Sequence, residues 1–176
     1  EIPLANATAA VEPRLDYVVA KFPRFPFDKF TSAPNTLGTQ MKATGEVMGI
    51  GSNLEECMLK SVRSLEVGVC HLYLAKFDSM SEEELLGYLT EFKSDNIFAV
   101  AQLLRMGVSI EKLYEVTRIT PYFLECFKRI VDTEKELSAK PLDVELLKKA
   151  KKQGFCDKFI AKLWNVTETE VCALRK

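Results

Sequence analysis

Hydrophobic positions along the chain follow two spacings, and the spacing changes near residue 52. Residues 17–22 form a β-branched and aromatic run that Pro23 is expected to end, which predicts a strand. Residues 45–51 alternate glycine with larger residues, which predicts a second strand whose glycines let another backbone approach closely. A lone hairpin is marginally stable in water, so we expect this region to pack on something else.

After residue 52, apolar residues recur every three or four positions, the spacing of helices with one buried face. Capping side chains mark the helix starts, and glycines mark several of the stops. These signals predict eight helices with short connections, and therefore a mainly α body with a short N-terminal β-hairpin or extended segment. The predicted helices span 52–68, 81–92, 95–107, 109–116, 120–137, 143–154, 157–164 and 167–175.

The spacing also assigns apolar stripes to the predicted core. In the helix over 81–92 the stripe is expected to end at Phe92, and in the long helix after residue 120 it is expected to begin at Phe123. Thr120 and Pro121 stand in the order preferred at a helix start, a capping side chain followed by proline at the first helical position. We therefore expect Thr120 to cap that helix.

Composition narrows the class of protein. The chain has 176 residues, of which 47% are hydrophobic and 28% charged, with a net charge of -1. These values are typical of a soluble globular protein with a substantial core, built as one domain or as one domain with an appendage. A near-neutral charge argues against a protein that coats a phosphate backbone. No apolar run approaches the roughly 18–20 residues of a membrane helix, and residues 1–10 lack the features of a signal peptide. The expectation is a cytoplasmic protein without a membrane partner.

Histidine and cysteine usage limits the possible chemistry. His71 is the single histidine, which excludes any histidine cluster. No two cysteines form a CxxC pair, so neither a zinc knuckle nor a dithiol redox motif is supported. Scattered cysteines are expected to be reduced and partly buried thiols. The five are Cys57, Cys70, Cys126, Cys156 and Cys172.

Three constellations resemble sites, and each has a structural alternative that we favour. The glycines of 45–51 precede a helix as in a phosphate loop, but no lysine follows Gly51 and no nucleotide fingerprint fits. Residues 82–84 are three glutamates at a helix start, where successive side chains point apart rather than around a cation. Cys70 and His71 are neighbours, and adjacent residues seldom face one another as nucleophile and base. The sequence therefore predicts no catalytic, cofactor-binding or metal-ligating residue.

A helix-turn-helix reader of nucleic acid is the alternative function, through residues 155–175. Two short helices and a tight turn have the spacing of such readers. The second helix, however, begins with Glu168 and Glu170, and two carboxylates would repel phosphate. The lysine-rich run 148–152 is basic, but such runs usually form a solvated helix face.

Several strings resemble the large chain of carbamoyl-phosphate synthase. Residues 12–30 and 40–51 resemble, in order and spacing, the end of that family's first ATP-grasp half. Residues 54–66 resemble the opening helix of the family's helical oligomerisation domain, and 154–175 resemble its closing helical hairpin. The resemblance spans nearly the whole chain, although residues 69–78 match no part of it that we can place.

The resemblance implies two regions: 1–51 as the C-terminal remnant of the first, carboxyphosphate-forming synthetase domain, and 52–176 as the oligomerisation domain. The full enzyme would be a cytoplasmic ATP-dependent ligase that makes carbamoyl phosphate from bicarbonate and glutamine-derived ammonia for pyrimidine and arginine synthesis. It would use MgATP, with potassium as a further candidate cofactor. The implied partners are the remainder of the large chain, a glutaminase small chain or domain, and a second copy of the chain.

Within that enzyme, this piece is expected to link the two synthetase halves and to support assembly. Alone it is expected to be inactive and to hold no cofactor, because the family's nucleotide and metal residues lie upstream of the matched strings. Under this interpretation, residues 155–175 form a structural hairpin, with no nucleic-acid partner.

Overall fold

The computed structural model describes residue 12 and residues 15–175, so the expectation about a signal peptide in 1–10 lies outside the described residues. Within them, a two-stranded antiparallel hairpin precedes eight α-helices and one short 3-10 turn, which confirms a mainly α fold with an N-terminal hairpin. The elements are β1 (Val18–Arg24), β2 (Gly45–Gly51), α1 (Leu54–Ser64), η1 (Ala75–Phe77), α2 (Glu82–Tyr88), α3 (Asn96–Met106), α4 (Ile110–Thr117), α5 (Pro121–Ala139), α6 (Val144–Lys152), α7 (Asp157–Trp164) and α8 (Glu168–Arg175).

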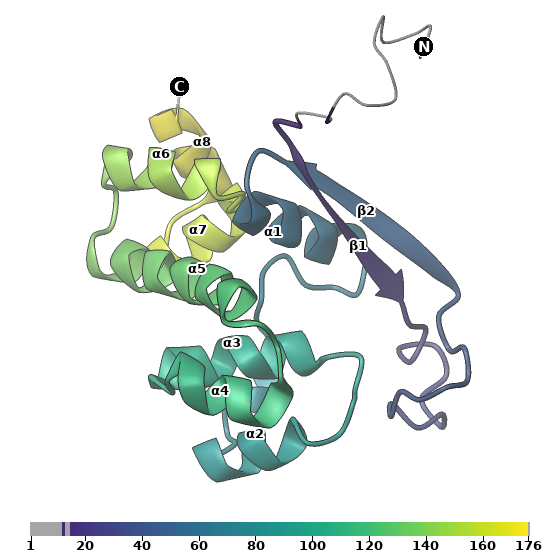
Figure 1. The fold of residues 1–176 in the computed structure, drawn as a ribbon. Helices are drawn as coiled ribbons and strands as arrows, with labels where there is room; N and C mark the ends of the chain where they lie inside the picture. Colours follow the sequence, from purple (N-terminus) through teal and green to yellow (C-terminus); the bar gives the residue numbers. More distant parts are fainter. Residues whose placement is uncertain (1–11, 13–14, 176) are drawn as a thin grey trace, which may run out of the picture.

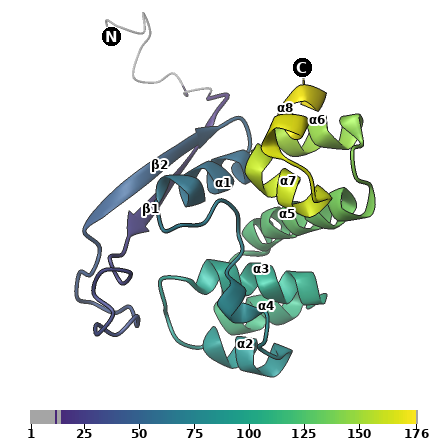
Figure 2. The ribbon, with the colours of Figure 1, turned by 180° about the vertical axis from the view of Figure 1, so that it is seen from behind.

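Helix α1 lies between the hairpin and the C-terminal helices (Figures 1 and 2). Helices α5 to α8 pack on the side of α1 away from the strands, while α2, α3 and α4 form a second group on the side of α5 opposite α6. One continuous apolar core joins the two groups, and its largest members include Leu59, Leu103, Leu124, Ile130 and Phe155. Burial of this core provides the main free energy of folding.

The hairpin lies directly on α1 because two glycines of β2 face that helix. A Cβ atom on Gly49 would come within 2.2 Å of Ser61 Oγ and 2.5 Å of the Cys57 carbonyl oxygen. On Gly51 it would come within 3.0 Å of the Cys57 backbone nitrogen. No larger residue fits such a contact, so the close backbone approach predicted from the glycine spacing is confirmed.

Polar contacts hold the same interface. The Cys57 thiol donates to the Gly49 carbonyl at 2.9 Å, and the Ser61 hydroxyl lies 3.3 Å from the carbonyl of Ala20 on β1. The two side chains stand one turn apart on α1 and therefore face both strands.

The segment between the strands is attached to the helical body at a second place. Asn35 Oδ1 accepts hydrogen bonds from the backbone N–H and the hydroxyl of Ser94, at 3.2 and 2.5 Å. The Leu37 N–H donates to the Phe92 carbonyl at 2.6 Å. These bonds fix the distal end of the hairpin against the connection between α2 and α3.

Several helix ends lie where the sequence predicts them. Ser109 accepts from the Lys112 N–H at 3.2 Å and begins α4, and Asp143 accepts from the Leu146 N–H at 3.0 Å and begins α6. Gly107 ends α3 in the left-handed conformation, with φ of 92°. These three ends confirm the capping rules applied to the sequence.

Other expectations were wrong in detail. β1 does not end at Pro23, which pairs with Glu46 inside the strand. In the described part of the chain β1 pairs only with β2, and an edge strand tolerates proline. Helix α1 ends at Ser64, short of Gly68, and α2 ends at Tyr88.

Two assigned core residues and one cap also differ from expectation. Phe92 lies beyond α2 with 73% of its surface exposed, and Phe123 is 45% exposed on the first turn of α5. Thr120 precedes α5, but its side chain accepts no hydrogen bond there. Pro121 occupies the first helical position as predicted, and its fixed φ suits a helix start without a side-chain cap.

Candidate functional site

The three glutamates at 82–84 serve the start of α2 and its packing. Glu84 accepts a hydrogen bond from the Ser81 N–H at 2.7 Å and donates its own N–H to the Ser81 hydroxyl at 3.2 Å, which forms a capping box. Glu82 pairs with Lys112 on α4 at 2.6 Å. No group of three potential metal-ligating side chains occurs within residue 12 and residues 15–175.

The helical hairpin of α7 and α8 packs into the body on its apolar side. Trp164, near the end of α7, is buried, and its indole N–H donates to the Leu137 carbonyl on α5 at 2.8 Å. Asn165 turns the chain in the left-handed conformation. Glu170 accepts from the Thr167 N–H at 2.7 Å and so caps α8.

Lysines of the basic run 148–152 are engaged in ion pairs. Lys149 pairs with Glu136 at 2.6 Å, and Lys151 pairs with Asp157 at 2.8 Å. Lys148 pairs with Glu145 within α6, also at 2.8 Å. Neutralised lysines of this kind form the solvated helix face predicted for the run, and they provide little free charge for a phosphate backbone.

A partly buried ion pair joins the two helical groups. The Arg105 guanidinium on α3 donates to both carboxylate oxygens of Glu134 on α5, with its Nε at 3.0 Å and Nη2 at 2.9 Å. The same Nη2 donates to the Leu72 carbonyl at 2.7 Å. One guanidinium thus fixes α3, α5 and the segment after α1 together.

A second pair fixes α1 to α5. Glu55 is buried on the first turn of α1, and its carboxylate accepts a hydrogen bond from Arg129 Nε. Arg129 also contacts the Cys126 thiol at 2.8 Å. The contact with Glu55 raises the pKa of Arg129, so the guanidinium stays charged throughout the physiological range.

His71 is buried, with 2% of its surface exposed, and its ring stacks on Phe159 at 3.7 Å between ring centroids. The structural role favoured over a thiolate–base pair with Cys70 agrees with this packing. His71 Nε2 lies 3.4 Å from Glu134 Oε2, but the geometry does not make a hydrogen bond. Burial lowers the pKa of His71 despite the nearby carboxylate, so the imidazole is neutral at pH 7.

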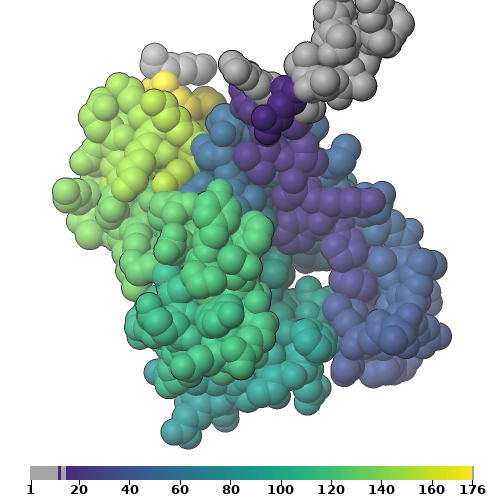
Figure 3. Space-filling view, viewed as in Figure 1, coloured from purple at the N-terminus to yellow at the C-terminus, as the bar shows by residue number. Residues whose placement is uncertain are grey.

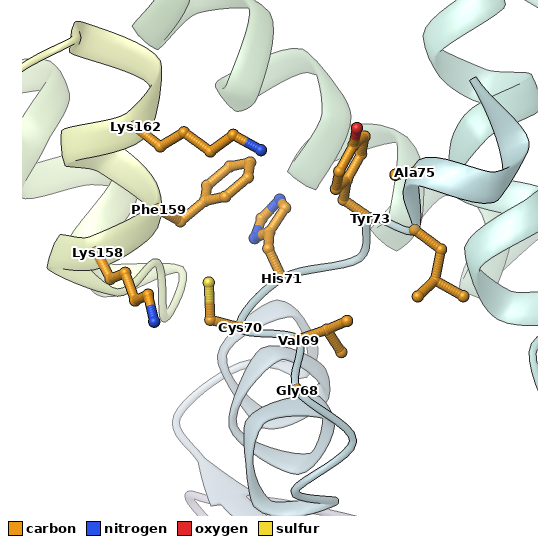
Figure 4. A pocket seen from close by; sticks show the side chains of 10 residues that line it. Gly68, Val69, Cys70, His71, Tyr73, Ala75, Lys158, Phe159 and Lys162 are labelled. Carbon is orange, nitrogen blue, oxygen red and sulfur yellow. The ribbon is translucent and has the colours of Figure 1, made fainter. Parts of the chain in front are cut away.

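A pocket of about 410 Å³ opens beside this histidine. Figure 4 shows its walls: the segment from Gly68 to Ala75 on one side, and Lys158, Phe159 and Lys162 of α7 on the other. Most of this segment belongs to residues 69–78, to which the sequence assigned no role. His71 projects between the Phe159 and Tyr73 rings.

All five cysteines are free thiols. Cys57 and Cys126 are buried and the other three are half-buried, which agrees with the expected reduced state. Burial raises the pKa of Cys57 and of Cys126, so neither is an activated nucleophile at pH 7.

An aromatic surface lies where α4 leads into α5. We call Tyr114, Tyr122 and Phe123 the α4–α5 surface; all three side chains are exposed. The Tyr122 and Phe123 rings meet edge to face at 5.4 Å, and the Arg118 guanidinium lies 5.6 Å from the Tyr114 ring centre. Helices α4 and α5 form one continuous green area facing the viewer in Figure 3. Aromatic and arginine side chains of this kind are enriched at protein interfaces.

The outer face of the hairpin is the second exposed apolar area. Val19 on β1 pairs with Ile50 on β2, and both side chains point away from α1 together with Met48, which is 64% exposed. A 2.8 Å ion pair between Lys21 and Glu46 lies beside them. An apolar sheet face bordered by charge is typical of a contact surface.

Sequence reasoning missed the α4–α5 surface because it assigned Phe123 to the core stripe. One signal was available: Tyr122 and Phe123 are adjacent in the first turn of a helix, and neighbouring helical residues point about 100° apart, so both cannot lie at the centre of one buried stripe. Their exposure was therefore predictable in part, but not the side of the molecule on which they lie.

No helix in the described part of the chain is both long and apolar enough to cross a membrane. A family model described as the oligomerisation domain of the carbamoyl-phosphate synthetase large chain matches residues 46–176. The match includes β2 from its second residue onward and the eight described helices, whereas β1, which pairs with β2, lies before it. The chain therefore belongs to the family of carbamoyl-phosphate synthetase large-chain oligomerisation domains.

Proposed function

We propose that this chain is the scaffolding segment of a carbamoyl-phosphate synthase large chain, which joins two synthetase halves and associates with a second copy of itself. The observation that carries the proposal is the docking of the hairpin on α1, where Gly49 and Gly51 remove all space between strand and helix. Because the hairpin is held so closely, a protein surface that packs on its outer face would be fixed relative to α1.

The hairpin face is proposed to contact the remainder of the large chain. Residues 12–30 and 40–51 resemble the end of an ATP-grasp half, and the exposed side chains of Val19, Met48 and Ile50 form the outer face of the hairpin. Covering exposed apolar side chains with another apolar surface is favourable, because it removes their surface from water.

The α4–α5 surface is proposed to contact a second copy. The family is one of oligomerisation domains, and this surface carries the aromatic and arginine side chains that dominate binding energy at interfaces. The same patch on both subunits would meet in a two-fold arrangement, the commonest symmetry of homodimers.

Sedimentation velocity at increasing concentration tests self-association. We expect the 176-residue chain to form a dimer or larger species, and Phe123→Glu to shift it toward monomer. Phe92→Glu, a glutamate in place of another exposed phenylalanine outside the surface, should leave assembly unchanged. A strict monomer at high concentration, or equal effects of the two variants, would contradict the proposal.

The wider enzyme is proposed from the same family. It would be an ATP-dependent ligase of the cytoplasm that uses MgATP and ammonia from a glutaminase partner, while this chain alone would neither bind nor hydrolyse ATP. Calorimetric titration with MgATP and a phosphate-release assay test the second part. Stoichiometric nucleotide binding or turnover would contradict the proposal that this chain alone neither binds nor hydrolyses ATP.

Nucleic-acid binding through residues 155–175 is the alternative, favoured by the tight turn between α7 and α8. It predicts retention on duplex DNA that falls steeply with salt. We expect no mobility shift at low salt, because Glu168 and Glu170 occupy the first turn of the second helix.

A further inference from the structure

Two cysteines from distant parts of the sequence meet where the segment after α1 contacts the start of α7. Cys70 and Cys156 are 86 positions apart, and the Cys156 thiol lies 3.7 Å from the Cys70 carbonyl oxygen. Burial raises the pKa of Cys70, and the neighbouring Cys156 thiol raises it further by charge and by a hydrogen bond. The two sulfur atoms therefore lie within reach of each other.

The backbone on both sides of the pair is fixed by aromatic packing. His71 follows Cys70, and Phe155 precedes Cys156. The buried His71 ring lies 4.8 Å from the Phe155 ring and 3.7 Å from the Phe159 ring, measured between centroids. Two groups held together in this way react at an effective concentration far above that of the same groups on separate molecules.

Both thiols are accessible to a small solute. Each is half-buried, whereas Cys57 and Cys126 are buried. Cys70 lines the pocket of about 410 Å³ beside His71, and Cys156 lines a second pocket of about 400 Å³. Figure 4 shows the Cys70 thiol at the wall of the first pocket. A molecule as small as hydrogen peroxide, which is close to water in size, needs much less space than either pocket provides.

We propose that Cys70 and Cys156 form a redox modification site, at which a peroxide joins them reversibly in a disulfide bond. Hydrogen peroxide first transfers one oxygen atom to one of the two thiols, so that the O–O bond breaks, a sulfenic acid forms and a water molecule leaves. The sulfur of the second thiol then attacks the sulfenic sulfur: the S–S bond forms, the S–O bond breaks and a second water leaves. The two thiols lose two electrons and two protons, which the peroxide accepts.

The bond would connect the segment after α1 covalently to the start of α7. It would close a loop between positions 70 and 156, and a closed loop restricts the unfolded chain more than the folded one. The pair lies outside the hairpin face and the α4–α5 surface, so its failure would not affect the proposed scaffold.

Oxidation of the full 176-residue chain by hydrogen peroxide tests the site. Unfolding in urea with N-ethylmaleimide then counts the thiols that remain, and tryptic digestion without a reductant identifies the linked peptides. Of the five thiols, we expect three to remain, because the other two are in the bond, and dithiothreitol should restore all five. The oxidised protein should melt about 5–10 °C above the reduced protein, because the closed loop is long.

Two cysteine variants separate this pair from general thiol oxidation. Cys156→Ser should abolish both the link and the increase in melting temperature, and serine suits the position before the first residue of α7. Cys172→Ser is the matched control, because Cys172 is also half-buried but lies on α8 beside Arg175. It should form the link as completely as the unmodified sequence.

Four results would overturn the proposal. The first is the accumulation of sulfinic acid on Cys70 or Cys156 without a link between them. The second is a link that joins other cysteines, and the third is a disulfide that forms only between two copies and increases with protein concentration. The fourth is an equal loss of the link in the Cys156→Ser and Cys172→Ser variants.

Discussion

Gly154 lies against Glu56 so closely that a Cβ atom on the glycine would stand 2.8 Å from the Glu56 Cα. The turn between α6 and α7 is thereby seated on the first turn of α1. The Gly154 carbonyl also accepts a hydrogen bond from Arg63 at 2.7 Å, and its φ is +87°. Two separate requirements, space and backbone conformation, call for glycine here.

Gly154→Ala should therefore lower the free energy of unfolding by about 2–4 kcal/mol, because a backbone clash adds to a left-handed conformation. Urea denaturation followed by circular dichroism measures it. Gly87→Ala is the matched control: that glycine lies within α2 with open space around it, and alanine should stabilise the helix by up to about 1 kcal/mol. Equal midpoints for the two variants would refute the close contact.

Gly49→Ala should loosen the hairpin from α1, because the new methyl group would meet the Cys57 carbonyl and the Ser61 hydroxyl. We expect amide hydrogen exchange in β1 and β2 to accelerate about tenfold or more, while α3 and α5 keep their protection. Gly45→Ala, in the same strand but with nothing within 4 Å, should leave the exchange rates nearly unchanged. Uniform acceleration across all elements would show that the hairpin does not open as a separate unit.

Arg105→Met should lower the free energy of unfolding by about 3 kcal/mol, because it leaves the Glu134 carboxylate partly buried without its partner. It should also raise the pKa of His71, since the positive charge of Arg105 disfavours a second cation there. Denaturant unfolding and an NMR titration of the single histidine measure the two effects. Lys128→Met removes an exposed pair with Asp132 and should cost at most about 0.5 kcal/mol.

Stability should fall on mild acidification because of His71. Its pKa is lowered by burial in the folded protein, whereas the unfolded chain protonates near 6.5. Below that pH the unfolded state binds a proton that the folded state does not, so the stability present above pH 6.5 is progressively lost until the folded pKa is reached. The slope approaches about 1.4 kcal/mol per pH unit. His71→Phe should abolish the slope between pH 7 and 5.5, and a variant that keeps it would exclude His71 as the cause.

A second acid-sensitive group acts in a lower window. Burial acts to raise the pKa of Glu134, but its contacts with His71 and Arg105 outweigh burial and hold the pKa below the ordinary 4.5. Its contribution is present above that pH and is lost as the pH falls through the folded value. Because the two pH windows differ, one series of unfolding measurements across pH distinguishes the contribution of His71 to stability from that of Glu134.

Local signals predicted the elements that depend on local chemistry. The strand over 45–51, the capped start of α4 at Ser109 and the end of α3 at Gly107 all lie where glycine spacing and capping place them. Each is determined by a few neighbouring residues, so no tertiary information was needed.

Features that depend on tertiary packing were harder to predict from the sequence. Helical periodicity places Phe123 near an apolar stripe but does not say how wide the covered face is, and α5 leaves that edge uncovered. The pocket could not be predicted, because it brings Lys162 beside Tyr73 from nearly ninety positions away in the sequence. His71 was visible as a single histidine, but its missing hydrogen bonds became apparent only with the fold.

The two attachments of the hairpin have a mechanical consequence. A hairpin docked on α1 alone could still rotate about the line of that contact, whereas a second attachment away from the line prevents the rotation. The contacts of β2 with α1 form this line, and the hydrogen bond from the Ser94 N–H to Asn35 is the second attachment. The outer face of the hairpin is therefore held in one orientation relative to the helical body.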